Sequence, residues 1–164
     1  MPDKSPVLHM LCGKIAAGKS TLAARLGDLP GTVRISEDDW LHALYSDELR
    51  GLEDYARCSS KLRRIMGAHV AGLLGAGCSV VLDFPANTVE QRRWMRGILE
   101  STAASGQLHL LDTPDAVCLA RLSERNGRGD HPFKVTEAQF RQFSGHFAAP
   151  SPDEGLPIVR HRGG

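Results

Sequence analysis

The sequence has no apolar run long enough to cross a membrane, and its opening residues Met-Pro-Asp-Lys-Ser-Pro contain no apolar signal region. It has no Cys-x-x-Cys pair, and its 4 cysteines and 7 histidines are scattered without the spacing of zinc ligands. It also lacks an excess of one charge, since 20 Lys and Arg stand against 19 Asp and Glu. We therefore expect a cytoplasmic protein with reduced cysteines and no basic track for nucleic acid.

The chain shows no internal repeat and no low-complexity tract. Its 164 residues fit one domain with a core that needs no disulfides. We expect a single domain over residues 1–164.

One short motif is present, GKIAAGKST at residues 13–21, which has the spacing of a phosphate-binding P-loop. The apolar run 7–12 before it predicts a buried strand, and Leu22 and Leu26 after it predict a helix. Backbone N–H groups of such a loop and helix start attract a phosphate; the alternative is an ordinary turn. The expected phosphate-binding residues are Gly13, Lys14, Ile15, Ala16, Ala17, Gly18, Lys19, Ser20 and Thr21.

Two side chains of this loop have expected roles in nucleotide chemistry. Lys19 can reach the β- and γ-phosphates, and the Ser20 hydroxyl can be a ligand of Mg²⁺. Lys14 is unusual inside such a loop, and the sequence assigns it no role.

Strands and helices alternate along the rest of the chain. Further strands are expected at 32–36, 79–84, 107–112 and 158–161, and helices at 38–45, 55–74, 88–104, from 114, and from 136. His9 and His109 fall inside apolar strands, which predicts interior histidines. This alternation predicts an α/β fold with a parallel sheet covered on both faces.

Ligands of such sheets bind at the carboxyl ends of the strands, where Ser20, Asp38 and Asp83 fall. Asp83 is a candidate Mg²⁺ ligand or substrate-positioning residue, and the alternative is a turn or helix-cap aspartate. Asp38 can accept a proton from an attacking hydroxyl, with Asp39 as the other candidate base and helix capping as the alternative for each.

Arginines near the predicted glycine-rich loop 126–132 form a second group of candidates. Arg121 and Arg125 lie four residues apart on one helix face, which suits a closing lid over residues 121–135 that neutralises a transferring phosphate. The alternative is a solvated face with Glu124 as charge partner. Arg92 and Arg93 are weaker candidates for contact with the acceptor.

These motifs resemble those of the small P-loop kinases related to zeta toxin, chloramphenicol phosphotransferase and the 5′-kinase domain of phage polynucleotide kinase, which are often described as AAA family ATPases. The matching segments are GKIAAGKST, Ile35 to Trp40 with Asp38 at the position of the general base, Leu82 to Thr88 followed by Arg92, and Arg121 to Asn126 at the lid. The resemblance implies the P-loop NTPase three-layer sandwich with a five-stranded sheet in the order 2-3-1-4-5.

The resemblance also implies transfer of the γ-phosphate of ATP, with Mg²⁺, to a hydroxyl of a small molecule. It places Asp38, Trp40, Asp83, Asn87 and Arg92 on the acceptor side. An arginine follows the base by three residues in the polynucleotide kinases, and Leu41 stands there in this chain, so a nucleic-acid acceptor is not expected.

Three other functions stay open at this stage. One is a polynucleotide or nucleotide-sugar kinase; another is a nucleotide-binding module without catalysis. The third is a mechanical ATPase, although Phe84 stands where such proteins carry a catalytic Glu after the strand.

Overall fold

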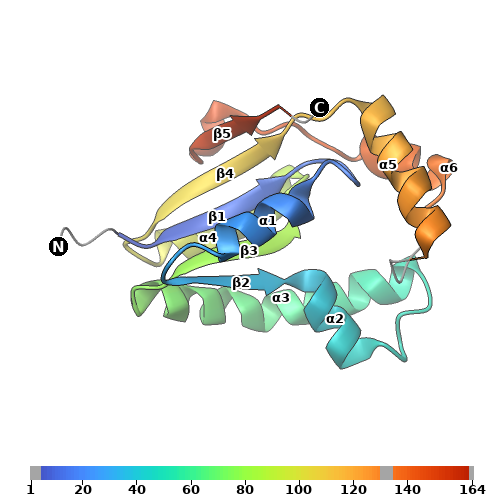
Figure 1. The fold of residues 1–164 in the computed structure, drawn as a ribbon. Helices are drawn as coiled ribbons and strands as arrows, with labels where there is room; N and C mark the ends of the chain where they lie inside the picture. The colour runs from blue at the N-terminus through green and yellow to red at the C-terminus, as the bar shows by residue number, and fades with distance from the viewer. Residues whose placement is uncertain (1–4, 130–134, 163–164) are drawn as a thin grey trace.

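The sheet has five parallel strands, and the computed structural model describes residues 5–129 and 135–162. The strands are β1 (Val7–Cys12), β2 (Thr32–Ser36), β3 (Ser79–Pro85), β4 (Ser105–Leu111) and β5 (Ile158–His161), in the order β2-β3-β1-β4-β5 (Figure 1). This confirms the predicted fold class and strand order. The phosphate loop therefore follows the central strand.

Helices cover the sheet on both faces (Figure 1). On one face α1 (Lys19–Gly27), α5 (Asp115–Arg128) and α6 (Glu137–Gly145) share a buried apolar cluster with Leu11, Val81 and Leu111 of the strands. On the other face α2 (Glu37–Tyr45), α3 (Leu52–Gly75) and α4 (Val89–Glu100) pack against Leu8, Met10 and Leu82. Because alternate residues of a strand face opposite sides, β1, β3 and β4 each contribute to both clusters.

The ends of two helices differ from the predicted ends. The helix expected to reach residue 104 ends at Glu100, because the Ser101 and Thr102 hydroxyls donate to the carbonyls of Ile98 and Leu99. The helix expected from residue 55 begins earlier and spans 24 residues as α3. Within the described ranges, none of the helices combines the length and apolar character needed to cross a bilayer.

Arg92 occupies an interior position in α4 that the sequence did not predict. Its side chain is 0% exposed, its Nε donates to Glu154 Oε1 at 2.9 Å, and its Nη1 donates to the carbonyl of Ala86 at 2.9 Å. The expected contact of Arg92 with an acceptor does not fit this position, because the guanidinium has no accessible surface. Arg92 instead joins the β3–α4 turn to the short 3₁₀ helix Pro152–Glu154.

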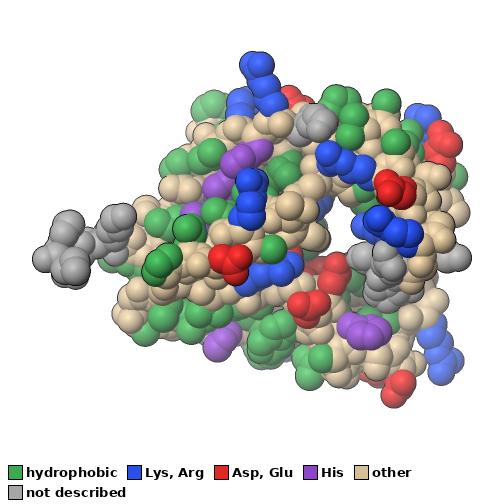
Figure 2. Space-filling view, viewed as in Figure 1, with side chains coloured by type: hydrophobic (Ala, Val, Ile, Leu, Met, Phe, Trp, Pro, Cys, Tyr) green, Lys and Arg blue, Asp and Glu red, His purple; other side chains and the backbone are tan. Residues whose placement is uncertain are grey.

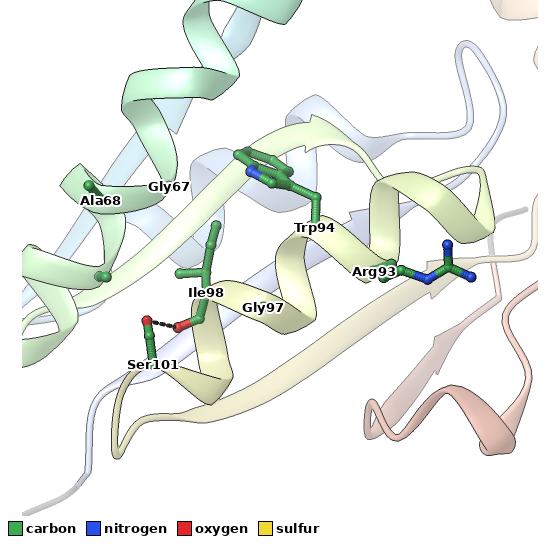
Figure 3. Close-up of a pocket in the computed structure, with 8 residues that line it drawn as sticks. Gly67, Ala68, Arg93, Trp94, Gly97, Ile98 and Ser101 are labelled. Carbon is green, nitrogen blue, oxygen red and sulfur yellow. Dashed lines mark hydrogen bonds between the residues drawn. The ribbon is translucent and has the colours of Figure 1, made fainter.

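A shallow groove of about 400 Å³ runs between α3 and α4 (Figure 3). Figure 3 shows Ile98 pointing toward α3 and Arg93 pointing away from it. Trp94 packs against Phe84 with ring centroids 5.7 Å apart, and the Arg63 guanidinium lies 5.5 Å from its ring. The groove belongs to the helical layer, and its lining residues are Gly67, Ala68, Ala71, Arg93, Trp94, Gly97, Ile98 and Ser101.

We expect Glu154→Ala to lower the free energy of unfolding by about 3 kcal/mol, because it leaves the buried guanidinium of Arg92 without its carboxylate. Urea unfolding followed by circular dichroism measures the change. Glu100→Ala is the matched control: it breaks the exposed Arg96–Glu100 pair and should change stability by less than about 0.5 kcal/mol. Equal effects of the two substitutions would contradict the role given to Arg92.

Candidate functional site

The loop between β1 and α1 has the backbone of a phosphate-binding loop. Gly18 precedes α1 with φ 108°, a left-handed conformation that favours glycine, and Ala16 also has a positive φ of 62°. At Gly13 a Cβ atom would lie only 3.2 Å from the side chains of Ala17 and Leu111, so the loop passes close to β4 there. No side chain among the described residues caps α1, and its first N–H groups can therefore bind an anion.

Side chains outside the loop hold it in place. Asn87 Oδ1 accepts a hydrogen bond from Gly13 N at 2.9 Å, and Thr113 Oγ1 donates to the carbonyl of Ala17 at 2.8 Å. Lys14 Nζ contacts Asp115 Oδ1 at 2.8 Å and lies 5.7 Å from the ring of Phe147. Lys14 thus has a structural role that the sequence did not reveal, since it links the loop to the start of α5.

Lys19 lies inside this loop. Its ammonium donates to the carbonyls of Gly13 and Lys14. Burial lowers the pKa of Lys19, while the thiol of Cys12 and the carboxylates of Asp83 and Asp38 act in the opposite direction. The predicted carboxylates of Asp38 and Asp83 therefore act on the pKa of Lys19.

The two carboxylates come from neighbouring strands. Ser36 pairs with Asp83 in the register of β2 and β3, and Asp38 follows in the first turn of α2. Ser36 is the cap of α2, because its Oγ accepts a hydrogen bond from Asp39 N at 3.3 Å. The capping role considered for Asp38 and Asp39 thus belongs to Ser36.

Asp83 accepts a hydrogen bond on Oδ2 from Arg34 at 3.1 Å. Its carboxylate and the Ser20 hydroxyl supply the oxygen donors that Mg²⁺ prefers beside phosphate groups. The predicted pair is therefore chemically suited to this ion.

The two arginines of α5 face the loop and the carboxylates. Arg121 Nη1 lies 3.4 Å from the carbonyl of Ala16. Arg125 Nε is buried and has no hydrogen-bond partner among the described residues. Burial lowers the pKa of Arg125, and the carboxylate of Asp38 opposes this shift.

The predicted glycine-rich loop is partly helix. Asn126 and Arg128 belong to α5, which ends at Gly129 with φ 67°. Asn126 Nδ2 donates to the carbonyl of Val135 at 2.6 Å, which joins α5 to the residues before α6. Residues 130–134 of the predicted loop and lid lie outside the described residues.

Trp40, the other predicted acceptor residue, lies on α2 with 37% of its surface exposed. Its ring is tilted against that of His69 on α3, with ring centroids 6.4 Å apart. Its exposure leaves the indole accessible, whereas the oxygen of Asn87 is already used by Gly13.

Figure 2 shows a hollow between the carboxyl edge of the sheet and α5. Lys and Arg side chains, with acidic atoms between them, border it on the side of α5, and Asp and Glu side chains border it on the side of α2. Opposite charges thus face one another across an open space at the end of the strands.

Sequence reasoning missed a buried carboxylate directly before Asp38. Glu37 is 2% exposed; it accepts hydrogen bonds from the Tyr55 and Ser59 hydroxyls of α3, and Arg63 Nε lies 3.9 Å from its Oε2. Burial raises the pKa of Glu37, and the Tyr55 and Ser59 hydrogen bonds oppose that shift. The pattern Tyr-x-x-x-Ser-x-x-x-Arg at 55, 59 and 63 puts these partners on one helix face, which was the available signal.

Sequence reasoning also missed most of a pocket of about 420 Å³ beside the phosphate loop. Its walls come from the start of α1, the end of β4, α5 and the end of β5. The lining residues are Ala17, Gly18, Thr21, Leu22, Arg25, Leu111, Arg121, His161 and Arg162.

A family model described as an AAA domain matches residues 8–150. A search of curated proteins finds no significant match. The residues matched by the family model include the phosphate loop, Asp38 and Asp83, and the α5 arginines Arg121 and Arg125.

Several solved structures share the fold. A protein of Chloroflexus aurantiacus with a provisional kinase assignment is 19% identical, with a TM-score of 0.75 over 97% of this chain and 86% of that one. A sugar kinase from Janibacter sp. is 19% identical, with a TM-score of 0.66 over 97% and 86%. The APS kinase of Mycobacterium tuberculosis, in complex with AMPPNP and APS, is 18% identical, with a TM-score of 0.63 over 96% and 88%.

We expect Tyr55→Phe to lower the free energy of unfolding by about 1–3 kcal/mol, because the buried carboxylate of Glu37 loses a hydrogen-bond donor. Thermal and urea unfolding measure the loss. Tyr45→Phe, at the other end of α2, removes a hydroxyl that does not contact Glu37 and serves as the control. The assignment fails if the two phenylalanine variants are equally stable.

Proposed function

The chain belongs to the AAA domain family, and we propose that it is an ATP-dependent kinase whose acceptor is a hydroxyl group of a small molecule. The observation that carries this proposal is the convergence of charged groups around the loop. The pairing of Ser36 with Asp83 brings Asp83 and the first turn of α2, with Asp38, together at the ends of neighbouring strands. Lys19 lies in the loop, and Arg121 Nη1 lies 3.4 Å from the carbonyl of Ala16. A phosphate cradle, a carboxylate on the acceptor side and a cation on the opposite side are the parts that phosphoryl transfer requires.

The phosphates of ATP would lie on residues 13–21, with the ammonium of Lys19 turned from the loop carbonyls to the β- and γ-phosphates. The nucleoside would occupy the 420 Å³ pocket, which shares Gly18 and Thr21 with the loop. The presence of AMPPNP in the structurally similar APS kinase supports a nucleotide in this fold.

Asp38 would orient the acceptor hydroxyl and take its proton as the oxygen attacks the γ-phosphorus. The new oxygen–phosphorus bond forms as the bond to the β-phosphate oxygen breaks, and ADP leaves. Arg121 and Arg125 would offset the negative charge of the transferring group. Mg²⁺, held by Ser20 and Asp83 together with the nucleotide, would supply further neutralisation of the phosphate oxygens.

A small acceptor is favoured over a nucleic-acid end by the side chains next to Asp38. Leu41 is 1% exposed and packs in the core, so it offers neither charge nor hydrogen bonds to a terminal phosphate. The structurally similar sugar kinase acts on a small hydroxylated molecule by name, which supports the same acceptor class here.

The direct test is ATP consumption with panels of sugars, other small alcohols, nucleosides, antibiotics and 5′-hydroxyl oligonucleotides. We expect phosphate transfer to a small alcohol and no end-labelling of oligonucleotides at micromolar concentration. Lys19→Ala should abolish the transfer, and Lys61→Ala, an exposed lysine of α3, should not. Efficient end-labelling would establish a polynucleotide kinase instead, and ATP hydrolysis that no acceptor stimulates would indicate an ATPase.

We expect Asp38→Asn to reduce the rate of phosphate transfer by about two to four powers of ten, because the amide cannot accept the hydroxyl proton. Binding of ATP, measured by calorimetry, should stay within about threefold of the original, since Asp38 acts on the acceptor side. Asp39→Asn is the matched control and should retain transfer. If the two variants exchange these results, Asp39 is the base.

A further inference from the structure

Three histidines from three neighbouring strands form a hydrogen-bonded row across one face of the sheet. His9 Nδ1 lies 2.9 Å from His109 Nε2, and His109 Nδ1 lies 2.8 Å from His161 Nε2. The ring centroids are 5.2 Å and 5.0 Å apart. Figure 2 shows histidine side chains gathered in a line on this face, over β1, β4 and β5.

The register of the strands explains the row. His109 pairs with Leu11 and His161 pairs with Leu111, so each histidine is two residues from the position opposite its neighbour. A shift of two residues keeps side chains on the same face of a sheet. The three rings therefore step diagonally from the central strand β1 to the edge strand β5.

The inner two rings are buried, and their burial favours the neutral form. His9 is 6% exposed and His109 is 4% exposed. Burial lowers the pKa of His9; burial, His9 and His161 together lower the pKa of His109 to about 4. A neutral imidazole has one N–H, so each ring donates on one side and accepts on the other, and the three tautomers must agree along the row.

The outer end of the row lies at the candidate nucleotide site. His161 lines the 420 Å³ pocket together with Gly18 and Thr21 of the phosphate loop and with Arg121. Its Nε2 shares a hydrogen bond with His109 Nδ1, and its Nδ1 makes no hydrogen bond to any described residue. An aromatic ring with one unused polar atom can both stack on a base and hydrogen-bond to its edge.

We propose that His161 contacts the purine base of the bound nucleotide and determines which purine is preferred, and that His109 and His9 are positioning residues that fix its ring orientation and tautomer. This inference rests on the proposed nucleotide site. The tautomer of the row decides whether Nδ1 of His161 presents a donor or an acceptor. Adenine and guanine carry opposite donor and acceptor groups at position 6, so a fixed tautomer discriminates between them.

The test measures the dissociation constants of ATP, GTP and inorganic tripolyphosphate, each with Mg²⁺, for the original protein and its variants. Tripolyphosphate has no base and reports the phosphate loop alone. We expect the original protein to bind ATP and GTP with affinities that differ by roughly tenfold or more. His161→Phe keeps a flat ring but removes its nitrogens, and should bring the two affinities within about twofold while leaving tripolyphosphate binding unchanged.

His109→Phe tests the positioning role, because it breaks both hydrogen bonds of the row from outside the pocket. We expect it to reduce the difference between ATP and GTP as His161→Phe does, and His109→Gln, which can still donate and accept, to restore part of it. His146→Phe, at the end of α6, is the control and should change nothing. Circular dichroism checks that each variant is folded. If His109→Phe is unfolded, the comparison of His161→Phe with His109→Gln tests the positioning role instead.

Two outcomes would overturn the inference, and they are distinguishable. If tripolyphosphate binds but the original protein does not discriminate between ATP and GTP, or His161→Phe keeps the discrimination, His161 does not read the base and the kinase proposal stands. If none of the three ligands binds, the nucleotide site itself is wrong and the inference falls with it.

Discussion

Parallel pairing of all five strands is the constraint on which the rest of the molecule depends. It brings the ends of β1, β2, β3 and β4 to one edge of the sheet, although the residues that follow them are far apart in sequence. The phosphate loop, Asp38 and Asp83 then lie together without any long-range motif in the sequence. The pairing of Ser36 with Asp83 is the clearest instance, because it places α2 and its acidic first turn beside the end of β3.

The acidic and basic side chains at this edge of the sheet come from different strands, loops and helices. The acidic groups come from the β2–α2 junction and β3, and the cations come from the phosphate loop and α5. The protein as a whole has a formal net charge of +1, so the site gains its field from local arrangement and not from an overall excess of one sign. Partial burial of Lys19 and Arg125 strengthens these interactions, since water screens them less than at the open surface.

Local patterns in the sequence were sufficient to predict the strands and the main helices, whereas the order of the strands in the sheet was implied by the resemblance to a known family. The phosphate loop, the strand ends and the starts of the helices near residues 88 and 136 all depend on residues close in sequence. At both helix starts a threonine, Thr88 or Thr136, forms a capping box with the glutamine three residues later. Arg92 could not be placed in this way. Its burial depends on Glu154, 62 residues further along the chain, and a charged residue on an amphipathic helix is otherwise expected at the surface. The predicted loop at residues 126–132 began too early in the sequence. Gly127 is tolerated inside α5, and the helix continues to Arg128, with Gly129 as its cap.

The ion pair between Lys14 and Asp115 attaches one end of α5 to the phosphate loop and leaves the other end further from this contact. Asp115 is the first residue of the helix, and its ion pair fixes that end to the phosphate loop. At about 1.5 Å per residue, Arg121 lies roughly 9 Å and Arg125 roughly 15 Å along the helix from this anchor. Any tilt about the anchored end therefore displaces Arg125 by more than one and a half times as much as Arg121. Such a tilt would change the position of Arg121 beside the loop less than that of Arg125.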